Sequence, residues 1–176
     1  VSATMAITIM VPNSLGPAEL LLHYGTDEQK ERYLAKLATG EEMPCFGLTE
    51  PTAGSDAGGL TSEGVVFKDE SDQLQIRFNW DKRWITLSGI STVVGLAFLL
   101  KDPDQLLGGP TDYGITCALI PTDTPGIDVS KRHDPLGVPF VNCPIKGVDV
   151  VMPLTCVIGG YDGFGNGWTM LMDCLS

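Results

Sequence analysis

The sequence predicts a mainly β domain, with a short helical segment before it and the start of a helix after it. From residue 45 to residue 153, the apolar runs are short, rich in Val, Ile, Phe or Thr, and bounded by Gly, Pro, Asp or Asn. Runs of this kind are typical of strands joined by turns. The 176 residues, 43% of them hydrophobic, are enough for one domain with a real core.

The first forty residues indicate a small helical group. Residues 17–24, PAELLLHY, are expected to form a short helix. The next helix is expected to begin at Thr26, where TDEQ is a capping-box pattern, and to end at Gly40. Residues 1–10 contain no breaker and suit a buried helix end or a strand, and Pro12 is expected to close that element.

Eight strands are expected in the β region. They are residues 45–48, 64–67, 74–78, 83–87, 92–100, 115–120, 127–129 and 145–151. The longest irregular stretch, residues 101–112, includes LLGG without a helical or strand pattern, and its role is open. Glycines from 159 to 167 lead into an apolar helix that begins at Trp168, and this helix is expected to pack in a domain outside the chain.

Composition and charge exclude several partners. Lys and Arg total 11 against 22 Asp and Glu, a formal net charge of −11, and no basic cluster is longer than two residues. This argues against nucleic acid or an anionic membrane as partner. Five cysteines without a C-x-x-C pair indicate free thiols in a reducing cytoplasm. His23 and His133 are far apart in sequence, so no metal site is expected, and each is interpreted as a surface or packing residue.

No signal peptide is recognised, because the apolar residues 1–11 have no basic flank and no cleavage site follows them. The apolar residues 90–100 are only about half of the ~20 that a membrane-spanning helix requires. The chain starts without Met and stops at Ser176 inside an expected helix. We therefore expect a fragment of a longer protein.

Two stretches carry the strongest functional signal. Residues 45–56, CFGLTEPTAGSD, lead from an apolar run into a loop of small residues, which suits a ligand with phosphates or a planar heterocycle. Residues 82–86, KRWIT, place Trp84 and Thr86 on one face of an expected strand, as a flat wall beside a hydroxyl. Taken alone, the loop is as often a surface turn, and a strand tryptophan belongs to the core more often than to a cofactor site.

Other ligand and catalytic motifs are not matched. The loop lacks the Lys of a P-loop and does not form the G-x-G-x-x-G of a dinucleotide fingerprint. The glycines near Gly163 suit a hinge as well as a phosphate loop. Ser55 has no histidine nearby in sequence, so hydrolase chemistry has little support.

Taken together and in order, six stretches resemble the middle of a flavin-dependent acyl-CoA dehydrogenase. They are CFGLTEPTAGSD (45–56), KRWIT (82–86), GITCALIPTDTPGI (114–127), LGVP (136–139), VDVVMP (148–153) and GFGNGW (163–168). MVPNSLGP, LLHYGTDEQK and LLGG are similar, more narrowly, to the large fatty acyl-CoA dehydrogenase of bacterial β-oxidation. The resemblance covers nearly the whole chain.

The resemblance implies a three-part organisation. Residues 1–42 would end an N-terminal helical domain, residues 43–153 would form a middle β-barrel or sandwich domain, and residues 154–176 would be the linker and start of a C-terminal helical domain. The implied reaction is FAD-dependent α,β-dehydrogenation of a fatty acyl-CoA to trans-2-enoyl-CoA in β-oxidation. In the family the catalytic carboxylate belongs to the C-terminal domain, so no catalytic residue is assigned here and the isolated chain is expected to be inactive. Glu50 is a poor substitute because it belongs to the cofactor loop.

The resemblance also implies the residues that bind FAD. They are Phe46, Leu48, Thr49, Gly54, Ser55, Trp84, Ile85 and Thr86. Leu48 and Thr49 are expected to bond the polar edge of the flavin ring. Gly54 and Ser55 are expected to approach the pyrophosphate, and Ser55 also the acyl-CoA.

In the second stretch, Trp84 would cover one face of the isoalloxazine, and Thr86 would donate its hydroxyl to flavin N5. Two departures from the family pattern occur. Thr52 stands where a Gly is more usual, and Leu87–Gly89 stand where Asn-Gly commonly follows W-I-T. Neither removes a contact that the resemblance implies.

The resemblance implies partners for the full-length protein as well. Electron-transfer flavoprotein is the expected electron acceptor, and the full-length protein is expected to be a homo-oligomer. Its expected location is the cytoplasm, with association at the inner face of the membrane as a further option. The alternatives are an acyl-CoA oxidase or flavin monooxygenase on the same scaffold, or a non-catalytic barrel domain.

Overall fold

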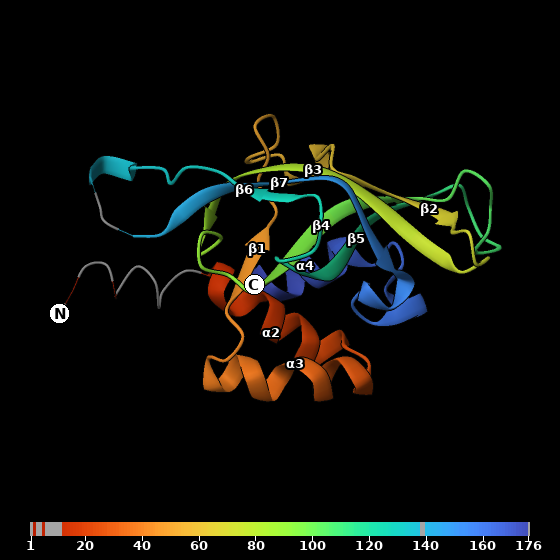
Figure 1. The fold of residues 1–176 in the computed structure, drawn as a ribbon, viewed down its shortest axis with the longest axis horizontal. Coiled ribbons are helices and arrows are strands. Elements are labelled where there is room, and N and C mark those ends of the chain that lie inside the picture. The colour runs from red at the N-terminus through yellow and green to blue at the C-terminus, as the bar shows by residue number, and fades with distance from the viewer. Residues whose placement is uncertain (1, 3–4, 6–11, 138–139, 176) are drawn as a thin grey trace.

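The computed structural model of the chain describes residues 2, 5, 12–137 and 140–175. Most of residues 1–10, for which a helix end and a strand were both open, and residues 138–139 of the LGVP stretch lie outside this part. Within it, seven strands form one curled sheet, with α2 and α3 packed below it (Figure 1). The strand order is β1-β4-β2-β3-β7-β6, with β5 paired to β4. The prediction of a mainly β, barrel-type domain with flanking helices is confirmed.

The strands follow the predicted positions with one main difference. They are β1 (Pro44–Gly47), β2 (Glu63–Lys68), β3 (Leu74–Thr86), β4 (Val93–Lys101), β5 (Asp112–Pro121), β6 (Ile127–Val129) and β7 (Asn142–Pro153). The two strands expected at 74–78 and 83–87 are one continuous strand. The polar residues between them do not break it, because Asp81 faces outward while its neighbours Trp80 and Lys82 are buried.

The described helices are α2 (Pro12–Tyr24), α3 (Asp27–Thr39) and α4 (Gly167–Leu175). Pro12 was expected to close the preceding element but is the first residue of α2. Proline is tolerated there because the N–H that it lacks has no helical partner in the first turn. Helix α4 was expected to pack outside this chain, yet Met170 and Leu171 are buried against residues of α2 and β5.

The predicted capping box of α3 is confirmed. The Thr26 hydroxyl accepts a hydrogen bond from the Gln29 N–H at 3.3 Å, and Gln29 Oε1 accepts one from the Thr26 N–H at 3.1 Å. Gly40 ends the helix in the left-handed conformation, with φ 76°. The Gln29 side chain also donates to the Val157 carbonyl at 2.7 Å, so the same residue caps the helix and ties it to the sheet side of the domain.

Strand β4 separates two apolar clusters. Its alternate residues Leu96 and Phe98 belong to the cluster inside the sheet, where the Phe98 ring meets Phe78 edge-on with centroids 4.8 Å apart. Val93 and Ala97, on the other face, belong to the cluster beneath α2 and α3. Burial on both faces explains why β4 reads as a continuous apolar run rather than an alternating one.

The open stretch 101–112 is organised by a buried carboxylate. Asp102 is fully buried and accepts hydrogen bonds from the N–H groups of Leu106 and Leu107, at 2.9 and 2.8 Å. Both leucines pack against the cluster inside the sheet. The two leucines of LLGG therefore have a packing role that their local sequence pattern did not indicate.

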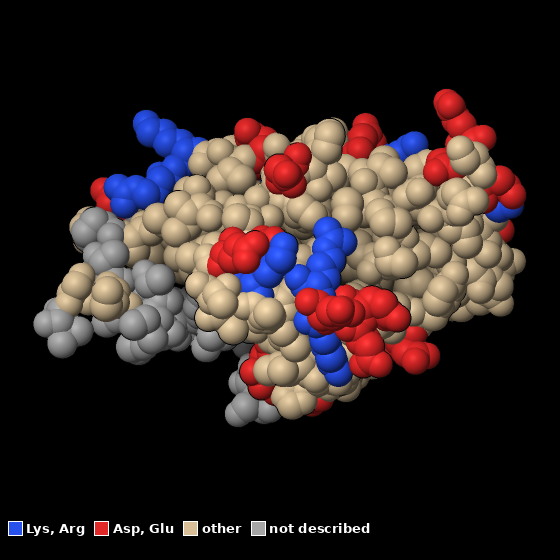
Figure 2. All heavy atoms as spheres, turned by 60° about the horizontal axis from the view of Figure 1, so that its bottom comes forward, with Lys and Arg blue, Asp and Glu red and all other residues tan. Residues whose placement is uncertain are grey.

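The surface reflects the acidic composition. On the face turned forward in Figure 2, acidic side chains gather beside a short band of basic ones. Among the described residues, the longest helices have 13 residues, and none is long and apolar enough to cross a membrane.

Candidate cofactor site

The fold brings the two functional stretches side by side. The loop that follows β1 rises above the sheet in Figure 1, and its first residues contact the last part of β3. The Thr49 carbonyl accepts a hydrogen bond from the Arg83 N–H at 2.9 Å. The Leu48 carbonyl accepts one from Lys82 Nζ at 3.1 Å. Residues more than thirty positions apart in sequence thus form one surface.

A buried ion pair fixes this arrangement. Lys82 Nζ lies 2.8 Å from Glu50 Oε1, and the two side chains are 0% and 1% exposed. The other end of the loop returns to the same carboxylate, which accepts hydrogen bonds from the N–H groups of Thr61 and Ser62 at 2.6 and 3.0 Å, and from both hydroxyls. Glu50 therefore holds both ends of the loop.

These contacts decide the charge of the carboxylate. Burial acts to raise the pKa of Glu50, but the hydrogen bonds that it accepts outweigh burial and lower the pKa to about 2. Burial lowers the pKa of Lys82, and the Glu50 carboxylate opposes that shift. A carboxylate held ionised, buried and paired is not free to act as a general base, in agreement with the interpretation of Glu50 as part of the loop.

Trp84 lies at a bulge in β3. The pairing with β7 shifts between Lys82 and Ile85, and Trp84 has φ 61°. This is an unusual conformation for a bulky residue, and such residues cluster at functional sites. The regular alternation expected from Trp84 to Thr86 is interrupted, because a bulge inserts an extra residue. Trp84 is 50% exposed, whereas Thr86 is 5% exposed.

Asn142, the first residue of β7, connects the two residues across the bulge. Its Nδ2 donates to the Trp84 carbonyl at 3.1 Å and to Thr86 Oγ1 at 3.3 Å. His133 Nδ1 lies 2.8 Å from Asn142 Oδ1, and the His133 ring packs on the Trp84 ring with centroids 4.1 Å apart. His133, interpreted from sequence as a surface or packing residue, therefore contacts Trp84, the residue expected to cover the flavin ring.

The other expected cofactor residues differ in what they expose. Phe46 is buried against α2 and β4, and the Ile85 side chain is buried in the cluster inside the sheet. Gly54 and Ser55 lie on the exposed side of the loop. An added Cβ at Gly54 would meet no atom within 4 Å, so the fold itself does not require glycine there. Close approach of a ligand to the backbone would require glycine at this position.

Several polar groups of this surface have unused hydrogen-bonding capacity. Among the described residues, no hydrogen bond engages the Leu48 N–H or the Thr49 hydroxyl. The buried Thr86 hydroxyl accepts from Asn142, but no acceptor for its own proton lies among the described contacts. A half-exposed indole, an open glycine and these donors fit a planar heterocycle that carries a pyrophosphate.

Three residues that shape the site were not predicted. Lys82 had a signal, because Phe78, Trp80 and Lys82 alternate onto the buried face of one strand. Asn142 and His133 had none. Their contacts depend on the pairing of Thr86 with Asn142, which are 56 positions apart.

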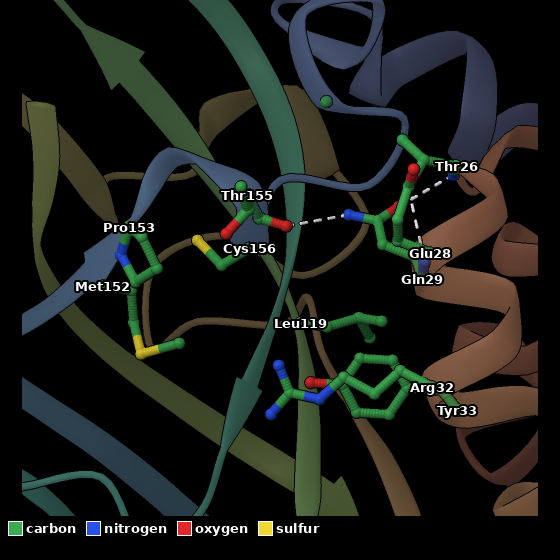
Figure 3. A pocket seen from close by; sticks show the side chains of 11 residues that line it. Thr26, Glu28, Gln29, Arg32, Tyr33, Leu119, Met152, Pro153, Thr155 and Cys156 are labelled. Atoms are coloured by element: carbon green, nitrogen blue, oxygen red, sulfur yellow. Dashed lines mark hydrogen bonds between the residues drawn. The ribbon is translucent and has the colours of Figure 1, made fainter.

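One cavity among the described residues lies away from these two stretches. Its volume is about 340 Å³, and it opens between α3 and the turn Leu154–Cys156. Figure 3 shows Arg32 and Tyr33 on the α3 side, with Gln29 joined to Thr155 across the cavity. None of the expected FAD residues lines it. We therefore place the candidate cofactor site on the surface made by the loop after β1 and the end of β3.

Family comparisons agree with the resemblance. The family described as Acyl-CoA dehydrogenase, middle domain, matches residues 45–150, and the one described as Acyl-CoA dehydrogenase, N-terminal domain, matches residues 1–41. The chain belongs to the acyl-CoA dehydrogenase family. Membership of this family supports the prediction of FAD, which the resemblance implied.

The chain matches only part of each of its longer relatives. Probable acyl-CoA dehydrogenase YngJ of Bacillus subtilis (strain 168) is 38% identical over 148 residues, 83% of this chain and 36% of that protein. Protein HemX of Proteus mirabilis is 53% identical over 77 residues, 44% of this chain and 45% of that protein. The structure of butyryl-CoA dehydrogenase from Megasphaera elsdenii matches with a TM-score of 0.80 and 27% identity, over 99% of this chain and 42% of that one. The chain thus spans less than half the length of these relatives.

Proposed function

We propose that the protein containing this chain is an FAD-dependent acyl-CoA dehydrogenase that converts a fatty acyl-CoA to the trans-2-enoyl-CoA in β-oxidation. The observation that carries the proposal is the meeting of the loop after β1 with the end of β3, at the Thr49 to Arg83 hydrogen bond. This contact joins the two stretches that resemble the flavin-binding motifs of the family. It is supported by the unused donors and the open glycine of the same surface.

Each residue would have a distinct task. When bound, FAD supplies the acceptor for the hydride that leaves the β carbon of the substrate. Trp84 would cover one face of the flavin ring, and the Thr86 hydroxyl would donate to it. Leu48 and Thr49 would bond its polar edge. Phe46 and Ile85 would support this surface from the core side, because their side chains are buried.

The pyrophosphate and the substrate would lie toward the exposed end of the loop. Gly54 offers open space there, and Ser55 is exposed beside it. We assign the pyrophosphate to both residues and the acyl-CoA to Ser55. The α proton of the substrate requires a base. In the family this carboxylate belongs to the C-terminal domain, and Glu50 is buried and paired with Lys82, so we assign no base in this chain. The isolated chain would therefore be inactive.

Family membership supports the remaining assignments of the proposal. Residues 1–42 would end the N-terminal helical domain, residues 43–153 would be the middle domain, and residues 154–176 would lead into the C-terminal domain. The complete protein would be a homo-oligomer that passes electrons to electron-transfer flavoprotein. The free thiols of Cys45, Cys117, Cys143 and Cys156 suit a reducing cytoplasm.

The test uses the complete protein. Purified material is expected to show flavin absorbance that bleaches when a long-chain acyl-CoA is added without oxygen. Colourless protein with no affinity for added FAD would contradict the proposal. Rapid oxygen consumption with acyl-CoA would instead identify an oxidase or monooxygenase. A yellow protein that no acyl-CoA bleaches would identify a non-catalytic domain.

A further inference from the structure

Asn142 contacts both Trp84 and Thr86, the two residues that form the candidate flavin wall. It pairs in register with Thr86 and is 6% exposed. Its Nδ2 donates to the Trp84 carbonyl at 3.1 Å and to Thr86 Oγ1 at 3.3 Å. A carbonyl oxygen only accepts, so the Nδ2 end of the amide must face β3 and the Oδ1 end must face away from it.

His133 completes the arrangement from the other side. Its Nδ1 lies 2.8 Å from Asn142 Oδ1, which only accepts. The proton of the neutral imidazole must therefore be on Nδ1. The His133 backbone N–H also donates to the Asn142 carbonyl at 2.7 Å, and the two ring centroids of His133 and Trp84 are 4.1 Å apart. The imidazole is thus held both to the amide and to the indole.

This orientation excludes one direction for the proton of the Thr86 hydroxyl. A hydroxyl has one proton to donate and two lone pairs that accept. Because one lone pair of Thr86 receives the Asn142 amide, its own proton points elsewhere, and no acceptor for it lies among the described contacts. Successive donors in one direction, from His133 to Asn142 to Thr86, strengthen one another in a buried setting.

Asn142 and His133 also hold the strained conformation of Trp84. Its φ of 61° costs free energy for a bulky residue, and such a conformation persists only where its surroundings hold it. The hydrogen bond from Asn142 to the Trp84 carbonyl holds the backbone of the bulge. The contact with the His133 ring holds the side chain.

We propose that His133 and Asn142 are positioning residues for the flavin: His133 backs the Trp84 indole, and Asn142 makes the Thr86 hydroxyl a donor toward the cofactor. This inference rests on the proposed function, since it concerns the same site. It assigns to two residues a role that neither the sequence motifs nor the family resemblance indicated.

The first experiment measures FAD affinity in the complete protein, by titrating FAD into deflavinated wild type and variants. Asn142→Ala is expected to raise the Kd at least about tenfold, the effect of losing hydrogen bonds at two wall residues. The matched control is Asn79→Ala, because Asn79 also bonds across the same pair of strands, to the Asp149 N–H at 3.0 Å, without contacting the wall. A control Kd within about twofold of wild type is expected.

A double-mutant cycle asks whether Asn142 acts through Thr86. Thr86→Val removes the hydroxyl and keeps the shape, and Thr86→Ser is the conservative variant expected to retain most of the affinity. If the residues act as a unit, Asn142→Ala raises the Kd less in the Thr86→Val background than alone. Equal factors in both backgrounds would overturn the role assigned through Thr86.

His133 supplies a test that does not depend on Asn142→Ala folding. His133→Phe keeps an aromatic ring against Trp84 but lacks the Nδ1 donor, and His133→Ala lacks both. We expect the Kd to rise for both variants, and more for alanine. An unchanged Kd for His133→Ala would show that the imidazole does not support the indole, and a lower Kd would show that it occupies the face that the flavin needs. Either result would overturn the proposal.

The last readout needs no cofactor. Nitrogen-15 NMR of the deflavinated protein is expected to show the His133 imidazole protonated at Nδ1. The Nε2 tautomer would overturn the network itself. If wild-type protein binds no FAD, the proposed function fails and the inference with it. If wild type binds FAD but Asn142→Ala binds it as tightly as Asn79→Ala does, only the inference fails.

Discussion

Lys82 Nζ and Glu50 Oε1 lie 2.8 Å apart and are shielded almost completely from solvent. The pair joins the end of β3 to the loop that follows β1, and the same carboxylate binds Thr61 and Ser62 at the far end of that loop. Removing one partner of a buried pair leaves the other charge uncompensated. The shape of the candidate cofactor loop therefore depends on both charges being present.

Lys82→Met is accordingly expected to lower the free energy of unfolding by about 3–5 kcal/mol. Urea denaturation of the complete protein measures this. The control is Lys68→Met, whose ion pair with Asp72 is exposed, and a change within about 1 kcal/mol is expected there. The combined Lys82→Met and Glu50→Gln variant is expected to recover part of the loss, because no charge is then left buried alone. Equal effects of Lys82→Met and Lys68→Met would contradict the importance of the pair.

The same pair predicts a pH dependence. The pKa of Glu50 in the folded protein, about 2, is below its ordinary value of 4.5. The unfolded state therefore binds more protons between these values, and stability falls as the pH falls. The contribution of Glu50 is complete above pH 4.5 and is lost as the pH approaches 2.

We expect the free energy of unfolding of the wild type to fall more steeply across this range than that of the combined Glu50→Gln and Lys82→Met variant. Urea denaturation at a series of pH values provides both slopes. Other carboxylates with lowered pKa values, such as Asp69 and Asp112, are present in both proteins, so the difference isolates the pair. Parallel slopes would mean that the carboxyl group of Glu50 titrates normally.

Two glycines are expected to respond differently to alanine. A Cβ at Gly147 would lie 2.4 Å from the Trp80 ring, whereas a Cβ at Gly54 would meet nothing within 4 Å. Gly147→Ala is therefore expected to destabilise the fold by about 1–3 kcal/mol through overpacking. Gly54→Ala is expected to change stability by no more than about 0.5 kcal/mol.

Thermal denaturation and FAD titration of both variants separate these effects. Gly54→Ala should weaken FAD binding while leaving the stability of the deflavinated protein intact, because the added methyl group fills the space proposed for the pyrophosphate. Unaltered FAD binding by Gly54→Ala would show that the pyrophosphate does not bind beside this glycine. Unaltered stability of Gly147→Ala would contradict the tight packing beside Trp80.

The parts of the fold that could be predicted from sequence are those set by neighbours along the chain. Helix α3 carries its own start and stop signals in Thr26, Gln29 and Gly40, and β4 has no polar residue before Lys101. The prediction failed at Pro12, where the same residue suits the end of one element and the first turn of another.

The candidate site was predictable only in part, because some of its contacts join residues that are distant in sequence. The loop after β1 and the KRWIT strand have recognisable sequences, so their meeting was expected from the resemblance. The bulge at Trp84 and the Asn142 bridge arise from the register between β3 and β7. Pairing over such a distance leaves no local pattern, and a strand read by alternation alone misses an inserted residue.

Substitutions at Trp84 can separate stacking from backbone strain. Trp84→Ala in the complete protein is expected to weaken FAD binding by about 1–3 kcal/mol, the effect of losing one aromatic stacking partner. Trp84→Phe retains a ring and is expected to lose less. At φ 61°, glycine is the residue that fits without strain. Trp84→Gly should therefore be more stable than Trp84→Ala without FAD, by about 1–2 kcal/mol, yet bind FAD as weakly.

Dilution of each flavin-loaded variant, followed by the release of flavin fluorescence, measures the first effect, and thermal denaturation of the deflavinated proteins measures the second. If Trp84→Ala retained FAD at the same dilution as the wild type, the indole would not contribute to FAD binding. Equal stability of the glycine and alanine variants would mean that the backbone at residue 84 relaxes to negative φ when the indole is gone. In that case the Trp84 ring and its contact with His133, rather than the hydrogen bond from Asn142, would be what maintains the bulge.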